Sequence, residues 1–278
     1  MHSEEEIFKI LGLPYIEPEL REDSGEIELA IENKLPELIR IEDIKGDLHA
    51  HSEWSDGTDS IEKMCLAAQK KGYAYLAVTD HSQSLKVAGG LDSKDLKKKK
   101  DEIDRLNKKF KDFRILFGTE VDIDAEGNLD YNDEILRQFD IVVAAIHTGF
   151  KNSKEQITKR ITRACLNKYV HIIAHPSGRL LGTREAYEAD FNEIFKVAFD
   201  THTALEINSF PQRLDLTDLN CRRAKELGVK LAINTDAHNT QQLDLMELGI
   251  TVARRGWVEA GDVLNTLELD KLLKSIAK

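Results

Sequence analysis

Short runs of apolar, β-branched residues alternate with longer charged and amphipathic stretches along most of this 278-residue chain. The short runs have the composition of buried strands, and they cover residues 44–52, 75–81, 115–123, 141–147, 171–175, 204–208 and 230–234. The stretches between them carry apolar residues at helical spacing, and they include residues 60–71, 93–110, 155–166, 190–201 and 217–227. Strand–helix alternation of this kind requires a parallel sheet, either open or closed into a barrel. Seven such units are one fewer than the eight of a TIM barrel.

Composition and charge exclude several classes of protein. Apolar residues make up 41% of the chain and charged residues 32%, which is typical of a packed protein and too apolar for a disordered one. No apolar run approaches the ~20 residues of a membrane span, and the acidic N-terminus does not resemble a secretory signal. A net charge of −11 disfavours a broad nucleic-acid-binding surface, which is usually basic. We expect a cytoplasmic protein in which Cys65, Cys165 and Cys221 are reduced and packed within helices.

The first 40 residues differ in character from the rest of the chain. Prolines interrupt residues 11–18, and residues 25–33 form a short acidic candidate for a helix. We expect residues 1–40 to form an arm packed on one domain of residues 41–278. Within that domain, the basic run Lys97–Lys100 lies in a predicted helix, and we expect it to be a solvated face rather than a nucleic-acid-binding patch.

Six of the nine histidines lie at, or directly after, the carboxyl ends of predicted strands. His49 and His51 are separated by one residue, so on a strand their imidazoles point to the same side. Asp236 and His238 repeat this spacing after the last strand. Because the carboxyl ends of parallel strands meet on one face, these side chains are expected to converge. The segments that follow the other strands complete the predicted cluster with Asp56, His81, Glu120, His147 and His175.

The remaining histidines do not share this placement. His2 is terminal, His171 opens a strand and His202 ends a helix, so we interpret all three as structural or surface residues. A single His-x-His pair or strand-end histidine is also structural more often than not. Only the joint pattern of the other six favours a metal site.

A cluster of imidazoles and carboxylates without thiolates suits zinc, manganese or iron. Three imidazoles can serve one ion, so six imidazoles with three carboxylates imply two or three ions. Clustered divalent ions activate a water near neutral pH and stabilise both the attacking and the leaving oxygen of a phosphoryl displacement. The chain contains neither a Gly-x-Ser-x-Gly motif nor a Walker-type glycine-rich loop, so the sequence does not favour a serine nucleophile or that nucleotide-binding loop.

At these positions the sequence resembles the PHP family, named for polymerase and histidinol phosphatase. The motifs follow the family's order over about residues 42–260, and they are His49-Ala50-His51 with Asp56, Thr79-Asp80-His81, Glu120, His147, His175-Pro176 and Asp236-Ala237-His238. The resemblance implies a distorted seven-stranded (β/α)7 barrel with a three-metal cleft. It assigns His49, His51, Glu120 and Asp236 to one ion, Glu120, His147 and His175 to a second, and Asp56, His81 and His238 to a third.

Further segments resemble the C-terminal PHP region of bacterial and archaeal family X DNA polymerases; they are Leu11–Ile16, Glu19–Glu22, Gly46–His49, Trp54–Gly57 and Asp80–Leu91. The polymerase part is not in this sequence, so the chain is either a free-standing relative or part of a longer protein. This resemblance implies Mn²⁺-dependent 3′–5′ exonuclease activity or related processing of DNA 3′ ends. A metal-activated hydroxide would attack the phosphodiester, with His49, His51, Glu120 and Asp236 as the catalytic centre and no side-chain nucleophile.

Positively charged side chains are expected to orient the substrate phosphate. The candidates are Arg179, Lys86 and Arg213, each of which can instead be an ordinary surface cation. One alternative function is that of a phosphomonoesterase for a small metabolite such as histidinol phosphate, which the acidic charge favours. Another is a metal-bound interaction module without catalysis, against which the complete ligand set argues. If DNA is the substrate, we expect the chain to grip only its end, or to rely on a partner such as a family X polymerase part.

Overall fold

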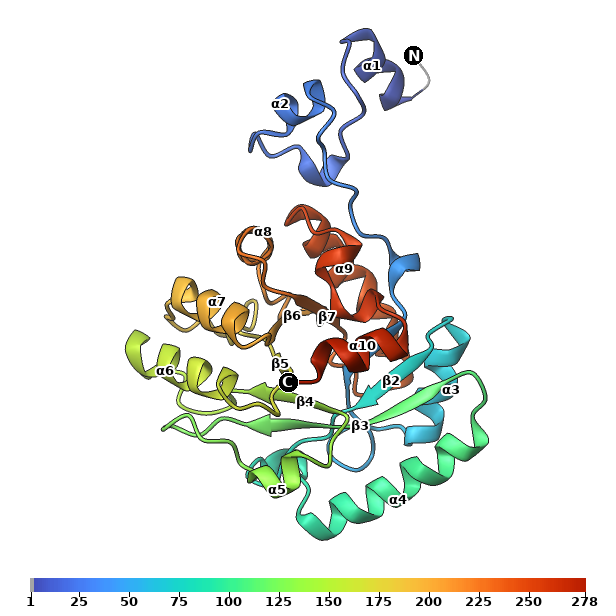
Figure 1. Ribbon diagram of the computed structural model, residues 1–278, viewed down its shortest axis with the longest axis vertical. Coiled ribbons are helices and arrows are strands. Elements are labelled where there is room, and N and C mark those ends of the chain that lie inside the picture. The colour runs from blue at the N-terminus through green and yellow to red at the C-terminus, as the bar shows by residue number, and fades with distance from the viewer. Residues whose placement is uncertain (1–2) are drawn as a thin grey trace.

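Seven parallel strands form one sheet, and their spatial order follows their order in the sequence. The computed structural model describes residues 3–278, so His2 lies outside the described residues. The strands are β1 (Gly46–Ala50), β2 (Tyr75–Val78), β3 (Arg114–Asp122), β4 (Ile141–Ala145), β5 (Ile172–Ile173), β6 (Ala204–Asn208) and β7 (Leu231–Asn234). Figure 1 labels β2 to β7. Every predicted strand is present, although β5 keeps only two residues of the predicted 171–175.

The sheet curves until its first strand meets the segment that follows its last. The Asp236 N–H donates to the His49 carbonyl at 3.0 Å, and the His51 N–H donates to the Ala237 carbonyl at 2.7 Å. Ala50 and Ala237 form a parallel bridge at the same place. These bonds nearly close a (β/α)7 barrel, which confirms the predicted fold class.

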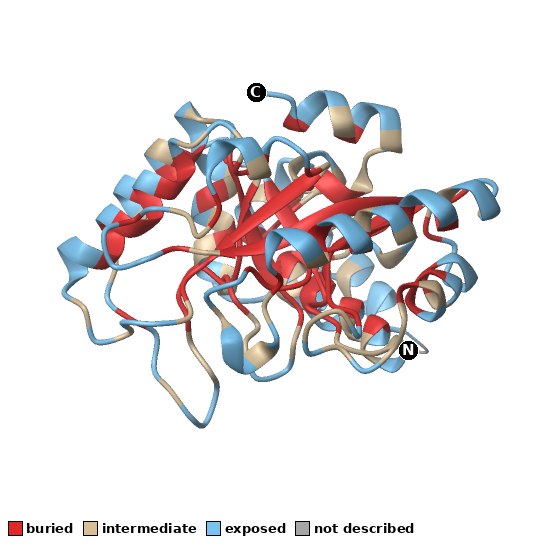
Figure 2. Ribbon diagram, turned by 90° about the horizontal axis from the view of Figure 1, so that it is seen from below, coloured by how far each residue is buried: buried red, intermediate tan, exposed pale blue. Residues whose placement is uncertain are grey.

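Helices between the strands cover the outside of the barrel (Figure 1). The predicted ones are present as α3 (Ile61–Lys70), α4 (Ser93–Lys109), α6 (Lys154–Cys165), α7 (Phe191–Asp200) and α8 (Asp218–Glu226). Each begins after a side chain that accepts a backbone N–H of the first turn, and these N-caps are Ser60, Asp92, Ser153, Asp190 and Thr217. Figure 2 shows the strands and the inner faces of these helices buried and the outer faces exposed.

The structure contains further helices, of which only α2 (Glu26–Ile31) matches a predicted segment. The others are α1 (Glu4–Ile10), α5 (Asp133–Leu136), α9 (Met246–Arg255) and α10 (Leu269–Ile276). In α9, Met246, Ile250 and Ala253 are buried at the spacing of an amphipathic helix. In α10, Leu272 and Ile276 pack against the residues inside the barrel. Both apolar patterns are present in the sequence, but they follow the last predicted strand, where no helix was predicted.

Alternate strand residues face opposite sides of the barrel wall. In β4, Val143 and Ala145 join the apolar cluster inside the barrel, whereas Val142 and Ala144 pack beneath the outer helices. Apolar side chains therefore fill the barrel from the end at which the strands begin. The polar residues gather at the carboxyl ends of the strands, where the ligands were predicted.

The segment predicted as an arm contacts the rest of the chain mainly at the end of α9. Ile16, Leu20 and Leu38 share an apolar cluster with Trp257, and Arg254 pairs with Glu19 at 2.5 Å. Figure 1 shows α1 and α2 projecting from this point, away from the strands. The division of the chain at residue 40 stays a prediction.

The expectation of solvent exposure is wrong for one residue of the lysine run. Lys97 and Lys98 are exposed, but Lys99 is fully buried and its ammonium lies 2.8 Å from the Asp80 carboxylate. Helical geometry explains the error, because one residue of four consecutive ones on an amphipathic helix turns toward the core. The three cysteines are free and buried on α3, α6 and α8, as predicted.

Candidate metal centre

All nine predicted ligands lie together at the carboxyl-end mouth of the barrel. Their nitrogen and oxygen atoms form three groups, each with its atoms within 4.8 Å of one another: His51, Asp56, His81 and His238; His49, His51 and Asp236; and His81, Glu120 and His147. His175 joins the third group, with its Nε2 atom 3.0 Å from the Glu120 Oε1 atom. Residues nearly 190 positions apart in sequence thus meet in one site because parallel strands end on one face.

Glu120 occupies the centre of this site. Its side chain is almost fully buried, and its carboxylate lies within 4.0 Å of five imidazoles: His49 at 3.5 Å, His51 at 3.6 Å, His81 at 2.9 Å, His147 at 3.3 Å and His175 at 3.0 Å. The two carboxylate oxygens divide these neighbours, with His147 and His175 on one oxygen and the rest on the other. A carboxylate so placed suits a bridge between two cations.

Several features of the cluster are unfavourable for a protein site without a cation. The Nε2 atoms of His49 and His51 face each other at 3.1 Å. The Nδ1 atoms of His51 and His81 are buried without a hydrogen bond to any described residue, although the latter is 2.9 Å from Glu120. A buried polar atom without a partner costs about 1–3 kcal/mol. Lone pairs converging in this way fit divalent metal ions, which imidazole and carboxylate ligands bind well.

Two of the predicted ligands also have unusual backbone conformations. His175 has a φ angle of +29° and Asp236 one of +54°, both in the left-handed region. Such conformations cost of order 1–3 kcal/mol and concentrate at functional sites. The backbone is therefore held in place here by the surrounding structure rather than by its own preference.

The electrostatic environment keeps the carboxylates ionised and some imidazoles neutral. Burial raises the pKa of Glu120, but the positive charges of His147 and His49 lower it by more, so that it lies well below its usual range. Burial, with the charge of His81, lowers the pKa of His51 to about 4. Burial, with the charge of Arg213, lowers the pKa of His175 to about 4. Ionised carboxylates and neutral imidazoles are the forms that bind metal ions.

Two carboxylates that the sequence did not reveal, the buried Glu206 and the half-buried Asp122, orient the imidazoles. The Oε1 atom of Glu206 is 2.7 Å from the Nδ1 atom of His49, which leaves the Nε2 atom of that ring facing the cluster. The Oδ1 atom of Asp122 contacts the Nδ1 atom of His147 in the same way at 2.5 Å. Carboxylates of this kind fix the ring and its tautomer. A signal for Glu206 was present, because it is a charged residue inside the buried strand β6.

The three predicted phosphate-binding cations have different environments in the structure. Arg213 reaches the cluster, with its Nε atom 3.4 Å from the Asp236 carboxylate. Arg179 lies beside it and donates to the backbone carbonyls of Arg213 and Leu214, so part of its guanidinium holds the neighbouring loop. Lys86 is exposed, and its ammonium group makes no hydrogen bond or ion pair with any described residue. The roles of these cations toward a substrate stay predictions.

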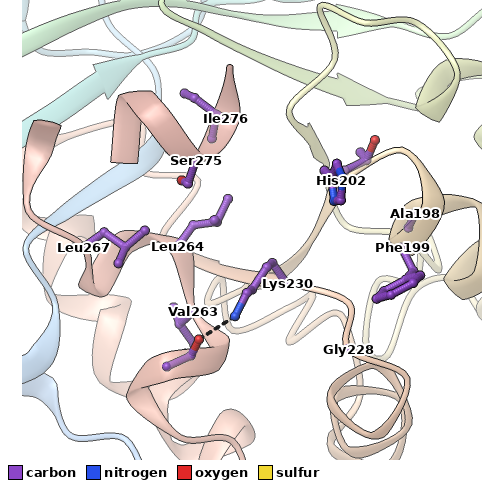
Figure 3. Close-up of a pocket in the computed structure, with 12 residues that line it drawn as sticks. Ala198, Phe199, His202, Gly228, Lys230, Val263, Leu264, Leu267, Ser275 and Ile276 are labelled. Carbon is purple, nitrogen blue, oxygen red and sulfur yellow. Dashed lines mark hydrogen bonds between the residues drawn. The ribbon is translucent and has the colours of Figure 1, made fainter. Parts of the chain in front are cut away.

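A hollow of about 330 Å³ lies at the other end of the barrel, beneath α10 (Figure 3). Its lining includes the apolar side chains of Phe199, Val263 and Ile276 together with His202. Lys230 crosses it and donates to the Gly261 carbonyl at 2.7 Å. None of the predicted ligands lines this hollow.

A parallel barrel with imidazoles and carboxylates clustered at the carboxyl ends of its strands defines a metal-dependent hydrolase. Residues 47–210 match the family model of the PHP domain, and residues 1–22 match that of the DNA polymerase beta thumb. The chain belongs to the PHP family and is a metal-dependent phosphoesterase. No helix within residues 3–278 has the length and apolarity needed to cross a membrane.

Known proteins resemble the chain over most of its length. It is 51% identical, over 96% of its residues, to the Bacillus subtilis (strain 168) protein named DNA polymerase/3′-5′ exonuclease PolX, and it spans 46% of that protein. It is 33% identical, over 79% of its residues, to a Thermoanaerobacter sp. (strain X514) protein named probable phosphatase, and it spans 89% of that protein. The match to PolX therefore accounts for only about half of that larger protein.

A solved structure confirms the fold. The histidinol phosphate phosphatase of Lactococcus lactis subsp. lactis Il1403, crystallised with zinc, L-histidinol and phosphate, matches with a TM-score of 0.58 at 20% sequence identity. The match covers 77% of this chain and 94% of that one.

Proposed function

We propose that this phosphoesterase hydrolyses phosphodiester bonds at DNA 3′ ends, as a 3′–5′ exonuclease or 3′-end-processing enzyme. One observation carries the proposal: the complete ligand cluster stands at the barrel mouth of a chain that is 51% identical to a protein named 3′-5′ exonuclease PolX. The match of residues 1–22 to a polymerase thumb supports a role alongside a family X polymerase part.

The nine clustered side chains would hold the metal ions, three in number by the family pattern. His49, His51, Glu120 and Asp236 would form the catalytic centre, and the ligand types suit Mn²⁺ or Zn²⁺ and also Fe²⁺. The zinc in the Lactococcus lactis phosphatase supports zinc as one candidate. When bound, such ions supply an activated water and neutralise the charge that develops on a phosphoryl group.

The protein's own residues would orient the substrate around this centre. Arg213 lies at the edge of the cluster, where its guanidinium can bind a phosphate oxygen beside Asp236. Arg179 fixes the backbone that carries Arg213. Glu206 and Asp122 hold His49 and His147 in the orientation that leaves their Nε2 atoms toward the centre.

A second candidate function is that of a phosphomonoesterase on a small metabolite such as histidinol phosphate. The 33% identical relative named probable phosphatase, most of whose length the chain spans, favours it. The net charge of −11 also suits a small substrate better than a long polyanion.

Two substrates separate these functions. Purified protein loaded with Mn²⁺ is incubated with 5′-labelled single-stranded DNA and with p-nitrophenyl phosphate. A ladder of shortened DNA supports the exonuclease, and release of p-nitrophenol without DNA cleavage supports the phosphomonoesterase. Inactivity on both from fully metallated protein refutes both. His51→Ala removes a ligand shared by two groups of the cluster, so we expect it to abolish metal-dependent activity and lower the bound metal measured by elemental analysis.

A further inference from the structure

The loop after β5, residues 176–190, is a fixed structure at the edge of the mouth. Leu180 and Arg184 exchange backbone hydrogen bonds of 2.8 and 2.7 Å, which closes a tight turn. Gly178 has a φ angle of +61°, and a Cβ atom there would lie 2.3 Å from the Tyr187 ring. The Leu181 N–H donates to the Gln212 carbonyl at 2.6 Å, which ties this loop to the one after β6. Side chains on this loop are therefore held in position.

Arg184 is a half-buried cation on this loop without an acidic partner. Its Nε atom donates to the Gly178 carbonyl at 2.9 Å, and its guanidinium carbon lies 3.6 Å from the centroid of the Phe150 ring. No carboxylate of the described residues lies within 4.0 Å of it. Burial, and then the positive charge of Arg213, lower the pKa of Arg184. The Leu181–Gln212 hydrogen bond joins the loop of Arg184 to the loop that carries Arg213, and no described carboxylate balances the charge of Arg184.

Charged side chains of both signs lie on the loops around the mouth. Arg179, Arg184 and Arg213 lie on the loops after β5 and β6, and Arg213 reaches the cluster. A separate groove of about 390 Å³ is lined by Asp122, Asp124 and Asp130, at the end of β3 and in the loop after it. A polyanion bound at the cluster is repelled by this acidic groove and attracted to the three arginines.

We propose that Arg184, stacked on Phe150, binds the phosphate of a polynucleotide that lies one nucleotide to the 5′ side of the phosphodiester being cleaved. The inference rests on the proposed nuclease function and adds a subsite to it. A substrate with a single phosphate places its charge at the cluster and Arg213, so it leaves Arg184 unbalanced. A polynucleotide supplies a second phosphate, and a guanidinium held by ring stacking is suited to bind it through its free Nη groups. Arg184 then selects polynucleotides over small phosphoesters.

The test compares two substrates in the Arg184→Met variant. One is a 5′-labelled single-stranded decanucleotide, and the other is the p-nitrophenyl ester of thymidine 5′-monophosphate, which has one phosphodiester. We expect kcat/KM for the decanucleotide to fall roughly tenfold more than kcat/KM for the small diester, mainly through KM. Arg105→Met removes an exposed arginine on α4 and serves as the control for loss of one positive charge.

Binding of the same labelled decanucleotide, followed by fluorescence anisotropy as salt is raised, gives a readout that does not depend on turnover. Loss of one phosphate contact reduces the slope of log K against log salt by about 0.7 in Arg184→Met. Arg184→Lys keeps the charge and is expected to restore the slope but not the full affinity, because it loses the planar stack.

The possible results separate this inference from the function on which it rests. Equal losses on both substrates, or an unchanged salt slope, overturn the second-phosphate subsite while the nuclease function stands. A wild-type protein that neither cleaves nor binds the decanucleotide overturns the nuclease function itself. If Arg184→Met does not fold, the comparison is made with Phe150→Leu, which removes the ring beneath the guanidinium and is expected to give the same selective loss.

Discussion

The buried ion pair between Lys99 and Asp80 is expected to be among the most costly interactions to break in this fold. The Lys99 ammonium lies 2.8 Å from the Asp80 carboxylate and donates to the carbonyls of Val78 at 2.9 Å and Gly118 at 3.1 Å. Asp80 in turn accepts the Ser52 N–H at 2.7 Å and the Ser55 hydroxyl at 2.8 Å. Ser52 directly follows His51, and Ser55 directly precedes Asp56. The ion pair between Lys99 and Asp80 therefore also supports these two proposed metal ligands.

Lys99→Met keeps the length of the side chain and removes its charge. The buried Asp80 carboxylate then has no cation, and two buried carbonyls lose their donor. Removing one partner of a buried pair costs about 3–5 kcal/mol, whereas exposed pairs are worth about 0–1 kcal/mol. We therefore expect the free energy of unfolding to fall by about 3–5 kcal/mol in Lys99→Met. Lys100, which pairs with Asp104 on the outer face of the same helix, provides the matched control Lys100→Met.

Urea unfolding followed by circular dichroism, with a chelator present so that metal binding does not contribute, measures these differences. The double variant Lys99→Met/Asp80→Asn removes both charges, and its loss should be smaller than the sum of the single losses by about 1 kcal/mol or more. If Lys99→Met and Lys100→Met destabilise the protein equally, to within about 0.5 kcal/mol, the argument from burial is wrong.

Two further predictions concern buried groups around the barrel. Both carboxylate oxygens of Glu206 accept hydrogen bonds, one beside His49 and the other from Asn208. In Glu206→Gln, either orientation of the amide therefore places an NH₂ group opposite one of these donors. We expect metal affinity to fall about 10–100-fold in an equilibrium metal titration, with exposed Glu193→Gln as control; wild-type affinity in Glu206→Gln would count against the orienting role. Burial lowers the pKa of His171 to about 4, and its Nδ1 atom accepts the Val142 N–H at 2.9 Å. In the unfolded chain this imidazole takes up a proton near pH 6.5, whereas in the folded protein it stays neutral down to about pH 4. The free energy of unfolding therefore decreases as the pH is lowered from about 6.5 to 4, and the loss is about 2 kcal/mol at pH 5. His171→Asn keeps a hydrogen-bond acceptor and does not titrate, so its free energy of unfolding should decrease less at low pH than that of the wild type. An equal decrease in urea unfolding would refute the role of His171.

The sequence predicted the clustering of the nine proposed ligands because their signal is local and the geometry that unites them is general. The spacing of His49 and His51 is fixed by the strand, and the convergence of Asp236 with Glu120 follows from the parallel sheet. Conversely, the contacts of Glu206 with His49 and of Lys99 with Asp80 depend on how separate segments pack. From the sequence alone, a charged residue in a strand or in a lysine run could pair with any of several side chains of opposite charge. Only the packing of the folded chain determines which of them it contacts.

The arrangement of charge would reconcile a strongly acidic chain with the proposed polyanionic substrate. The net charge of −11 opposes binding of a long strand along the surface, and the groove lined by Asp122 and Asp124 opposes it at one side of the mouth. Attraction would come from the metal ions together with Arg213 and Arg184, which lie on the loops after β6 and β5. A strand end could enter such a mouth and leave over the arginines, but a duplex laid across it would meet the acidic groove. The charge pattern thus favours recognition of a few terminal phosphates, which is the recognition that removal of nucleotides from a 3′ end requires.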